Sequence, residues 1–101
     1  MPKIFEYLGF IFFFYSNDHE PIHVHVCKGE IEVKVELFFE KNVLTNVSIR
    51  KNNGAKQNLT AVEREKIRRF VEKYYEEIVQ KWNDVKNGKR VRCKKINKEV
   101  K

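Results

Sequence analysis

The strongest constraint on the fold is a long amphipathic helix predicted from Thr60 to about Lys86. The helix starts at a capping box, Thr60-Ala61-Val62-Glu63, in which the Thr and Glu side chains hydrogen-bond to the first free backbone N–H groups. Apolar residues then recur at spacings of three and four, at Ile67, Phe70, Val71, Tyr74, Ile78, Val79, Trp82 and Val85. At about 1.5 Å per residue, such a helix is roughly 39 Å long and would cross a whole small sheet.

The residues before this helix have the patterns of β-strands. Two aromatic-rich runs flank Gly9, and the residues from 30 to 37 alternate strictly between apolar and charged. The predicted strands cover residues 4–8, 10–15, 23–26, 30–37 and 43–49. The fold class expected is α+β: an antiparallel or mixed sheet of about five strands, followed by one long helix packed on one face.

The length and composition predict one soluble domain. A chain of 101 residues is too short for two independent cores, and we expect the domain to span residues 1–88. No apolar run is long enough to cross a membrane, and the first residues lack the pattern of an export signal. We therefore expect a cytoplasmic protein. Its two cysteines, Cys27 and Cys93, are too few for a disulfide scaffold, so free thiols are expected.

All of the excess positive charge lies at the C-terminal end. Up to Val85, 13 Lys and Arg balance 13 Asp and Glu, whereas residues 86–101 hold eight basic residues and one acid, Glu99. We predict a flexible basic tail over residues 89–101, whose natural partner is a polyanion. The candidate nucleic-acid-binding residues are Lys89, Arg90, Arg92, Lys94 and Lys95. The alternative is a disordered terminus that only aids solubility.

All three histidines of the chain fall between His19 and His25. On an extended segment, His23, His25 and Cys27 project to the same side. Two chemistries fit this row. His23 and His25 could act as acid and base beside Asp18, or His19, His23 and His25 could bind a divalent metal such as zinc. The third possibility is that they are structural residues, hydrogen-bonded to neighbours.

The stretch from Phe12 to Val26, followed by Lys28-Gly29, resembles a family of small bacterial proteins that share domain of unknown function number 4160. Its hallmark is an aromatic strand ending in Tyr-Ser-Asn and followed by Pro-Pro-His-x-His-Val. Here Ile22 replaces the second proline, and the basic stretch after Gly88 is longer than the usual ending. The resemblance implies prominent roles for His23 and His25, and for Asn17 and Asp18 in the turn. It also implies a gene beside that of a small partner protein, in an arrangement like a toxin–antitoxin pair.

Three functions follow as hypotheses. The first is a toxin–antitoxin-like or regulatory component that binds nucleic acid through the tail and the adjoining helix. The second is a metal-binding protein or metal-dependent hydrolase that uses the histidine cluster. The third is a partner-binding module without catalysis.

The aromatic strand also predicts association. Phe10, Phe12 and Phe14 point to one side of it, and Ile11, Phe13 and Tyr15 point to the other. One helix covers one face only, so we expect a homodimer, or a complex with the neighbouring gene's product, to bury the second row.

Overall fold

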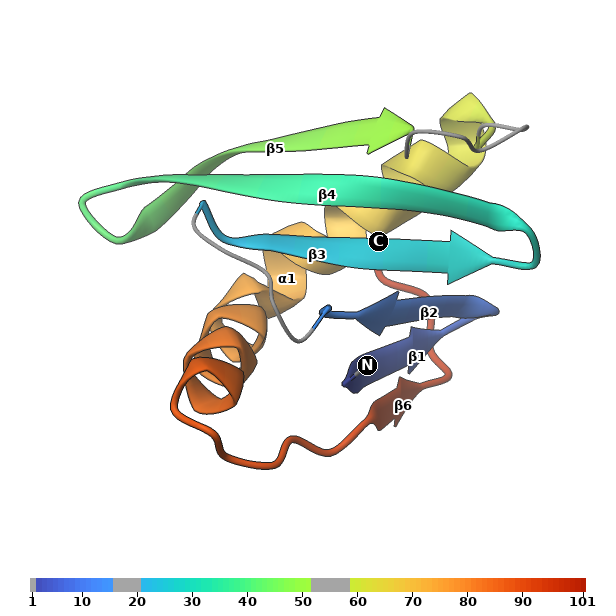
Figure 1. Cartoon of the computed structure of the whole chain (residues 1–101). Helices are drawn as coiled ribbons and strands as arrows, with labels where there is room; N and C mark the ends of the chain where they lie inside the picture. Colours follow the sequence, from blue (N-terminus) through green and yellow to red (C-terminus); the bar gives the residue numbers. More distant parts are fainter. Residues whose placement is uncertain (1, 16–20, 52–58) are drawn as a thin grey trace.

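The computed structural model describes residues 2–15, 21–51 and 59–101 as a six-stranded sheet with one helix on one face (Figure 1). The elements are β1 (Lys3–Tyr7), β2 (Phe10–Phe13), β3 (His23–Lys28), β4 (Ile31–Glu40), β5 (Val43–Lys51), α1 (Ala61–Lys86) and β6 (Lys94–Ile96). The strand order is β5-β4-β3-β2-β1-β6. All neighbours pair antiparallel except β6, which runs parallel to β1. The α+β prediction is confirmed, and the sheet is mixed.

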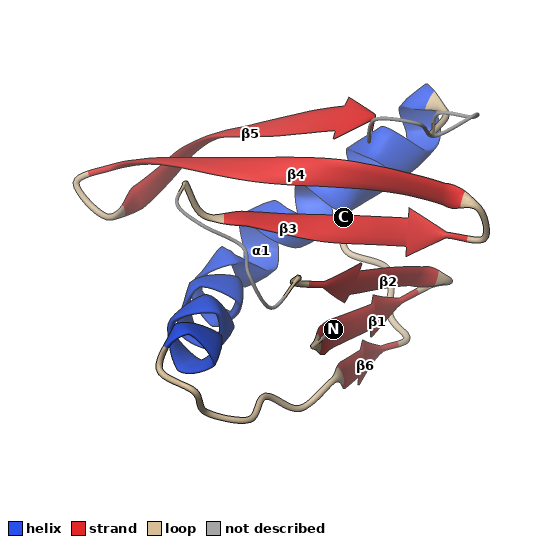
Figure 2. Cartoon of the chain, viewed as in Figure 1, coloured by secondary structure: helices blue, strands red, loops and turns tan. Residues whose placement is uncertain are grey.

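Helix α1 begins where the capping box predicts. The backbone N–H of Glu63 donates to Thr60 Oγ1 (3.2 Å), and the backbone N–H of Thr60 donates to Glu63 Oε1 (2.9 Å). The helix ends at Lys86, and Gly88 follows at a φ of 75°, a conformation that an L side chain rarely adopts. Because the helix crosses the strands behind the sheet, as Figure 2 shows, one stripe of its surface meets several strands.

The core between helix and sheet is largely aromatic. The ring of Phe70 lies 4.5 Å from Tyr7, 4.7 Å from Phe12 and 5.2 Å from Phe5, measured between centroids. Trp82 packs edge-on against Phe14 at 5.3 Å. These side chains are all buried. Burying one large apolar side chain contributes roughly 1.5–3 kcal/mol, so this cluster is a major source of stability.

The C-terminal segment differs from the flexible tail predicted. Residues 94–96 add strand β6 to the edge of β1, and the backbone N–H of Val100 donates to the hydroxyl of Tyr7 (2.9 Å). Val100 itself is buried, while Val91 and Ile96 pack against the core. These apolar residues, interleaved with the charges, hold the segment to the fold, so the domain extends beyond residue 88.

The second aromatic row is also covered differently from the prediction. Phe13 lies on the face of the sheet away from the helix, yet it is only 1% exposed. Its ring lies 5.3 Å from Tyr15 and 5.5 Å from His25, so neighbours in the same chain shield it. Ile11 and Tyr15 are half-buried. The surface on which the predicted homodimer rested is therefore largely absent.

Within the described residues, no helix is both long and apolar enough to cross a membrane.

Candidate functional site

His25 lies on the face of the sheet away from the helix, whereas His23, at the start of β3, also meets Trp82 of α1. Cross-strand pairing places His25 between Phe13 of β2 and Lys34 of β4, and His23 opposite Glu36. His23, His25 and Cys27 alternate with Val24 and Val26, whose side chains are in the core. The predicted row of two imidazoles and one thiol is therefore present on one face.

His25 sits in a small cluster of aromatic and acidic groups. Its ring stacks on Phe13 and meets Tyr15 edge-on, at a centroid distance of 4.4 Å. Its Nδ1 lies 3.8 Å from Glu32 Oε2. The Tyr15 hydroxyl donates to the same carboxylate, at 3.0 and 3.1 Å from its two oxygens. A positive charge on the imidazole would therefore be stabilised by Glu32.

His23 is held by a backbone hydrogen bond and by two ring contacts. Its Nδ1 donates to the carbonyl oxygen of Pro21 (2.9 Å), which places the proton of the neutral ring on Nδ1. The ring lies 5.1 Å from that of His25 and 5.3 Å from Trp82 of the helix. Both histidines are 6% exposed.

A second candidate site is the edge of the sheet at β6. Its five basic residues are exposed, and they lie on β6 and on the segment that leads to it; we call Lys89, Arg90, Arg92, Lys94 and Lys95 the basic edge. Lys81 Nζ donates to the backbone oxygen of Arg92 (2.8 Å), and Lys94 Nζ lies 3.2 Å from Glu77 Oε1. These contacts with α1 fix the path of the segment.

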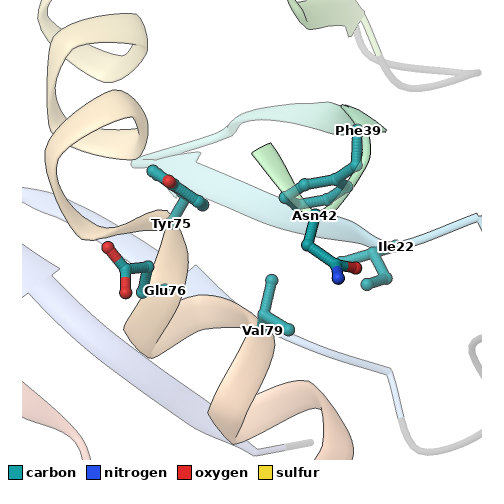
Figure 3. A pocket seen from close by; sticks show the side chains of 6 residues that line it. All are labelled: Ile22, Phe39, Asn42, Tyr75, Glu76 and Val79. Carbon is teal, nitrogen blue, oxygen red and sulfur yellow. The ribbon is translucent and has the colours of Figure 1, made fainter. Parts of the chain in front are cut away.

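A groove of about 500 Å³ separates α1 from the turn between β4 and β5 (Figure 3). Its walls are mostly apolar, with one amide and one carboxylate. The lining residues are Ile22, Phe39, Asn42, Tyr75, Glu76 and Val79. On the same hairpin, Phe38 is 39% exposed and Val43 is 57% exposed.

Comparison with known proteins gives one match. The family model described as Domain of unknown function (DUF4160) matches residues 9–83. The chain belongs to this DUF4160 family. The resemblance noted from the aromatic strand and the histidines is thereby confirmed. No curated protein and no solved structure matches the chain.

The part of the chain that matches the DUF4160 model can be located on the fold. It includes the histidine face, the groove and nearly all of α1, but it ends before β6. The family therefore carries no information about the basic edge.

The structure describes only some of the residues predicted to bind a metal or to act in catalysis in this DUF4160 chain. Asp18 and His19 lie outside the described residues. Among the residues that the structure does describe, no three His, Cys, Asp or Glu side chains gather closely enough to hold a metal ion. A zinc site at His23 and His25 would therefore need a ligand from outside the described residues, for which the sequence predicts His19. That set, and the catalytic set with Asp18, stay predictions.

Two members of the histidine cluster were missed by sequence reasoning. Tyr15 and Glu32 meet His25 only because β2, β3 and β4 are neighbours in a particular register. The alternation over residues 30–37 placed Glu32 on the polar face of its strand. That was the available signal, but the strand's partner could not be known from the sequence.

Neither cysteine is poised as a nucleophile. Burial raises the pKa of Cys27, and the nearby Glu32 raises it further while Lys3 lowers it in part. The pKa of Cys93, an exposed residue, is also raised, by partial desolvation of its thiol and by the nearby Glu6. Both thiols are free and carry their protons at neutral pH, so neither is the reactive thiolate form.

Proposed function

We propose that the protein binds nucleic acid through its basic edge. The observation that carries the proposal is that the excess charge of the chain is held on an ordered, exposed border of the sheet. Lysine and arginine side chains neutralise phosphates and release condensed counterions, which drives binding without any need for sequence recognition. This role suits a regulatory or toxin–antitoxin-like component.

The backbone of the basic edge is ordered, and this favours a role in binding over a role in solubility alone. A disordered tail must be fixed before its charges can act together, and that ordering opposes binding. Here the backbone is already held by pairing with β1 and by the hydrogen bond from Lys81. The charges therefore stand on a rigid frame with exposed side chains, of which Lys94 is also paired with Glu77 of α1.

We propose binding and not cleavage by the histidines. His23 and His25 are each 6% exposed, and their rings are packed against Trp82, Phe13 and Tyr15. A general acid or base must come within hydrogen-bonding reach of its substrate. In this arrangement the imidazoles instead tie β3 to β2 and to the helix.

The binding proposal is tested by salt-dependent affinity. We expect Arg92→Gln/Lys95→Gln to weaken binding of a labelled RNA or single-stranded DNA. The slope of log K against log salt should fall by about 0.7 for each phosphate that the variant no longer neutralises. Fluorescence anisotropy measured over a range of salt gives both quantities.

The matched control is Lys41→Gln/Lys51→Gln, which removes the same charge from two exposed positions at the opposite edge of the sheet, one in the turn before β5 and one at its last residue. If the two double variants lose affinity equally, net charge and not the basic edge governs binding. If the wild-type protein binds no nucleic acid at low salt, the proposal is wrong.

We also propose that two copies of the chain associate through the β4–β5 hairpin. The hairpin carries both a protruding part, Phe38 and Val43, and one wall of the groove, Phe39 and Asn42. A twofold dimer needs one patch that fits its own copy. A protrusion next to a recess meets that requirement.

A further inference from the structure

A small pocket lies beside the basic edge, at the turn between β1 and β2. Its volume is about 280 Å³, close to the lower end of the range of roughly 300–1,000 Å³ usual for small-molecule sites. The lining residues are Glu6, Leu8, Gly9, Phe10, Ile11, Lys95 and Asn97. The size suits one flat ring system and not a larger ligand.

Three strands bring the pocket residues together. In the sheet register, Glu6 of β1 is directly opposite both Ile11 of β2 and Lys95 of β6. Directly opposed residues share a face of the sheet, so these three side chains lie in one row. The pocket therefore exists only because β6 docks on β1, and it joins an apolar wall to the basic edge.

The lip of the pocket is a strained turn. Tyr7 pairs with Phe10, so Leu8 and Gly9 alone connect the strands, at φ values of 46° and 89°. Glycine adopts this conformation readily, but a leucine in it is strained, and such strain tends to occur at functional sites. Leu8 is also 43% exposed. An exposed apolar side chain at the rim offers a surface against which a flat ring can lie.

The polar groups of the pocket point to one class of ligand. Among the described residues, none hydrogen-bonds to or forms an ion pair with the side chain of Glu6, Lys95 or Asn97. A carboxylate has two acceptor oxygens and no donor. Of the common bases, only guanine presents two adjacent N–H donors on its Watson–Crick edge. Adenine, cytosine and uracil place an acceptor beside their donor, which a carboxylate repels.

We infer that this pocket binds an unpaired guanine, with Glu6 accepting from its two N–H groups. Lys95 and Asn97 are then placed to donate to the guanine carbonyl or to the adjoining phosphate. The Watson–Crick edge is free only in a single strand, so the ligand is single-stranded RNA or DNA carrying a guanine. This inference rests on the proposed nucleic-acid binding and gives it a base preference.

The test compares a labelled oligouridylate with the same strand carrying one central guanosine, and their DNA equivalents. We expect the guanine strand to bind the full-length protein about tenfold more tightly, since a good bidentate base contact discriminates by at least that order. Strands with a central adenosine or cytidine should bind like oligouridylate. Guanosine monophosphate, which lacks the other phosphates, should compete only weakly.

Glu6→Gln should abolish the guanine preference, because the amide replaces one acceptor with a donor, while affinity for oligouridylate is kept. The control is Glu99→Gln, which makes the same charge change at an exposed position outside the pocket, and which should keep the preference. Unfolding midpoints of both variants show that the fold is intact.

The outcomes separate the two proposals. Binding of all strands with no guanine preference overturns the guanine pocket and leaves the basic edge standing. A preference that survives Glu6→Gln also overturns it. Equal competition by guanosine monophosphate overturns the single strand as the ligand, because the phosphates of the strand would then add nothing. Failure to bind any strand overturns both proposals.

Discussion

Among single residues, Glu63 shows how one side chain can serve two contacts at once. It closes the capping box with Thr60 and forms an ion pair with Lys28 of β3, Nζ to Oε2 at 2.8 Å. The side-chain hydrogen bond from Lys28 and the backbone hydrogen bond from Thr60 lower the pKa of Glu63 from 4.5 to about 2. The start of the helix is thus tied electrostatically to the end of β3.

This lowered pKa predicts a pH-dependent contribution to stability. The folded state favours the ionised carboxylate, so the contribution is complete above pH 4.5 and is lost as the pH falls towards 2. At neutral pH, Glu63→Gln should lower the free energy of unfolding by less than about 1 kcal/mol, since solvent screens an ion pair near the surface.

The measurement is urea unfolding of wild type and Glu63→Gln across that pH range. The difference between the two proteins should shrink as the pH is lowered. Glu65→Gln is the control, because its carboxylate pairs with Arg69 on the exposed face of the helix and not with the sheet. A difference between wild type and Glu63→Gln that stays constant down to pH 2 would contradict the prediction.

The histidines show what a residue pattern can and cannot predict. Alternation alone placed His23, His25 and Cys27 on one side of a strand, and the structure agrees. The sequence did not reveal that Phe13 and Tyr15 would cover His25, because that depends on which strand lies next to β3 and in which register. The two histidines offered from the sequence as catalytic, metal-binding or structural residues are nearly buried.

Among the elements, the helix and the first five strands follow from local patterns, and β6 does not. The capping box and the spacing of apolar residues define α1 almost to the residue. Strand β6 has three residues, two of them lysine, and its pairing with β1 is remote in sequence. The many charged residues of this segment predicted a flexible tail. Its three apolar residues, Val91, Ile96 and Val100, instead hold it against the core.

Removing residues 89–101 should therefore destabilise the fold, contrary to what a flexible tail would imply. The truncation exposes the edge of β1, uncovers the site of Val100 and deprives the Tyr7 hydroxyl of its hydrogen bond. Loss of one buried apolar side chain alone costs roughly 1.5–3 kcal/mol. Urea unfolding followed by Trp82 fluorescence should show at least this decrease in the free energy of unfolding.

The control for the truncation is the full-length chain with Lys89, Arg90, Arg92 and Lys95 changed to glutamine and Lys94, which pairs with Glu77, retained. It removes most of the charge and keeps the apolar contacts, so its stability should match that of wild type. Equal stability of the truncated and full-length proteins would mean that β6 and Val100 contribute nothing to the fold.

In the molecule as a whole, the two edges of the sheet differ in character. One edge is the basic strand β6. The other edge is β5, which begins at the apolar tip of the β4–β5 hairpin. In Figure 1 the turn between β4 and β5 projects well away from β6. Association through the hairpin would therefore leave both basic edges exposed, and a dimer could contact one nucleic acid at two places, which raises its apparent affinity.

The hairpin dimer should be reversible. A twofold contact buries Phe38 and Val43 from each copy, and full burial of such side chains contributes roughly 1.5–3 kcal/mol apiece. Both side chains are already partly buried in the monomer, so the gain from the four of them is of the same order as the association cost of about 4–15 kcal/mol, and we expect a weak, reversible dimer. Val43→Glu should weaken dimerisation at least about tenfold, because it places a carboxylate in an apolar contact near Glu76 of the groove.

Light scattering after size exclusion, over a range of micromolar concentrations, measures the equilibrium. Val62→Glu is the matched control, because Val62 is 66% exposed at the start of α1 and is not a lining residue of the groove. The same charge there should leave the dimer intact. If wild type is a monomer at every concentration, or if both variants dissociate alike, the hairpin is not the self-association surface. A monomer that gains mass only when a second, different protein is added would assign the groove to that partner instead.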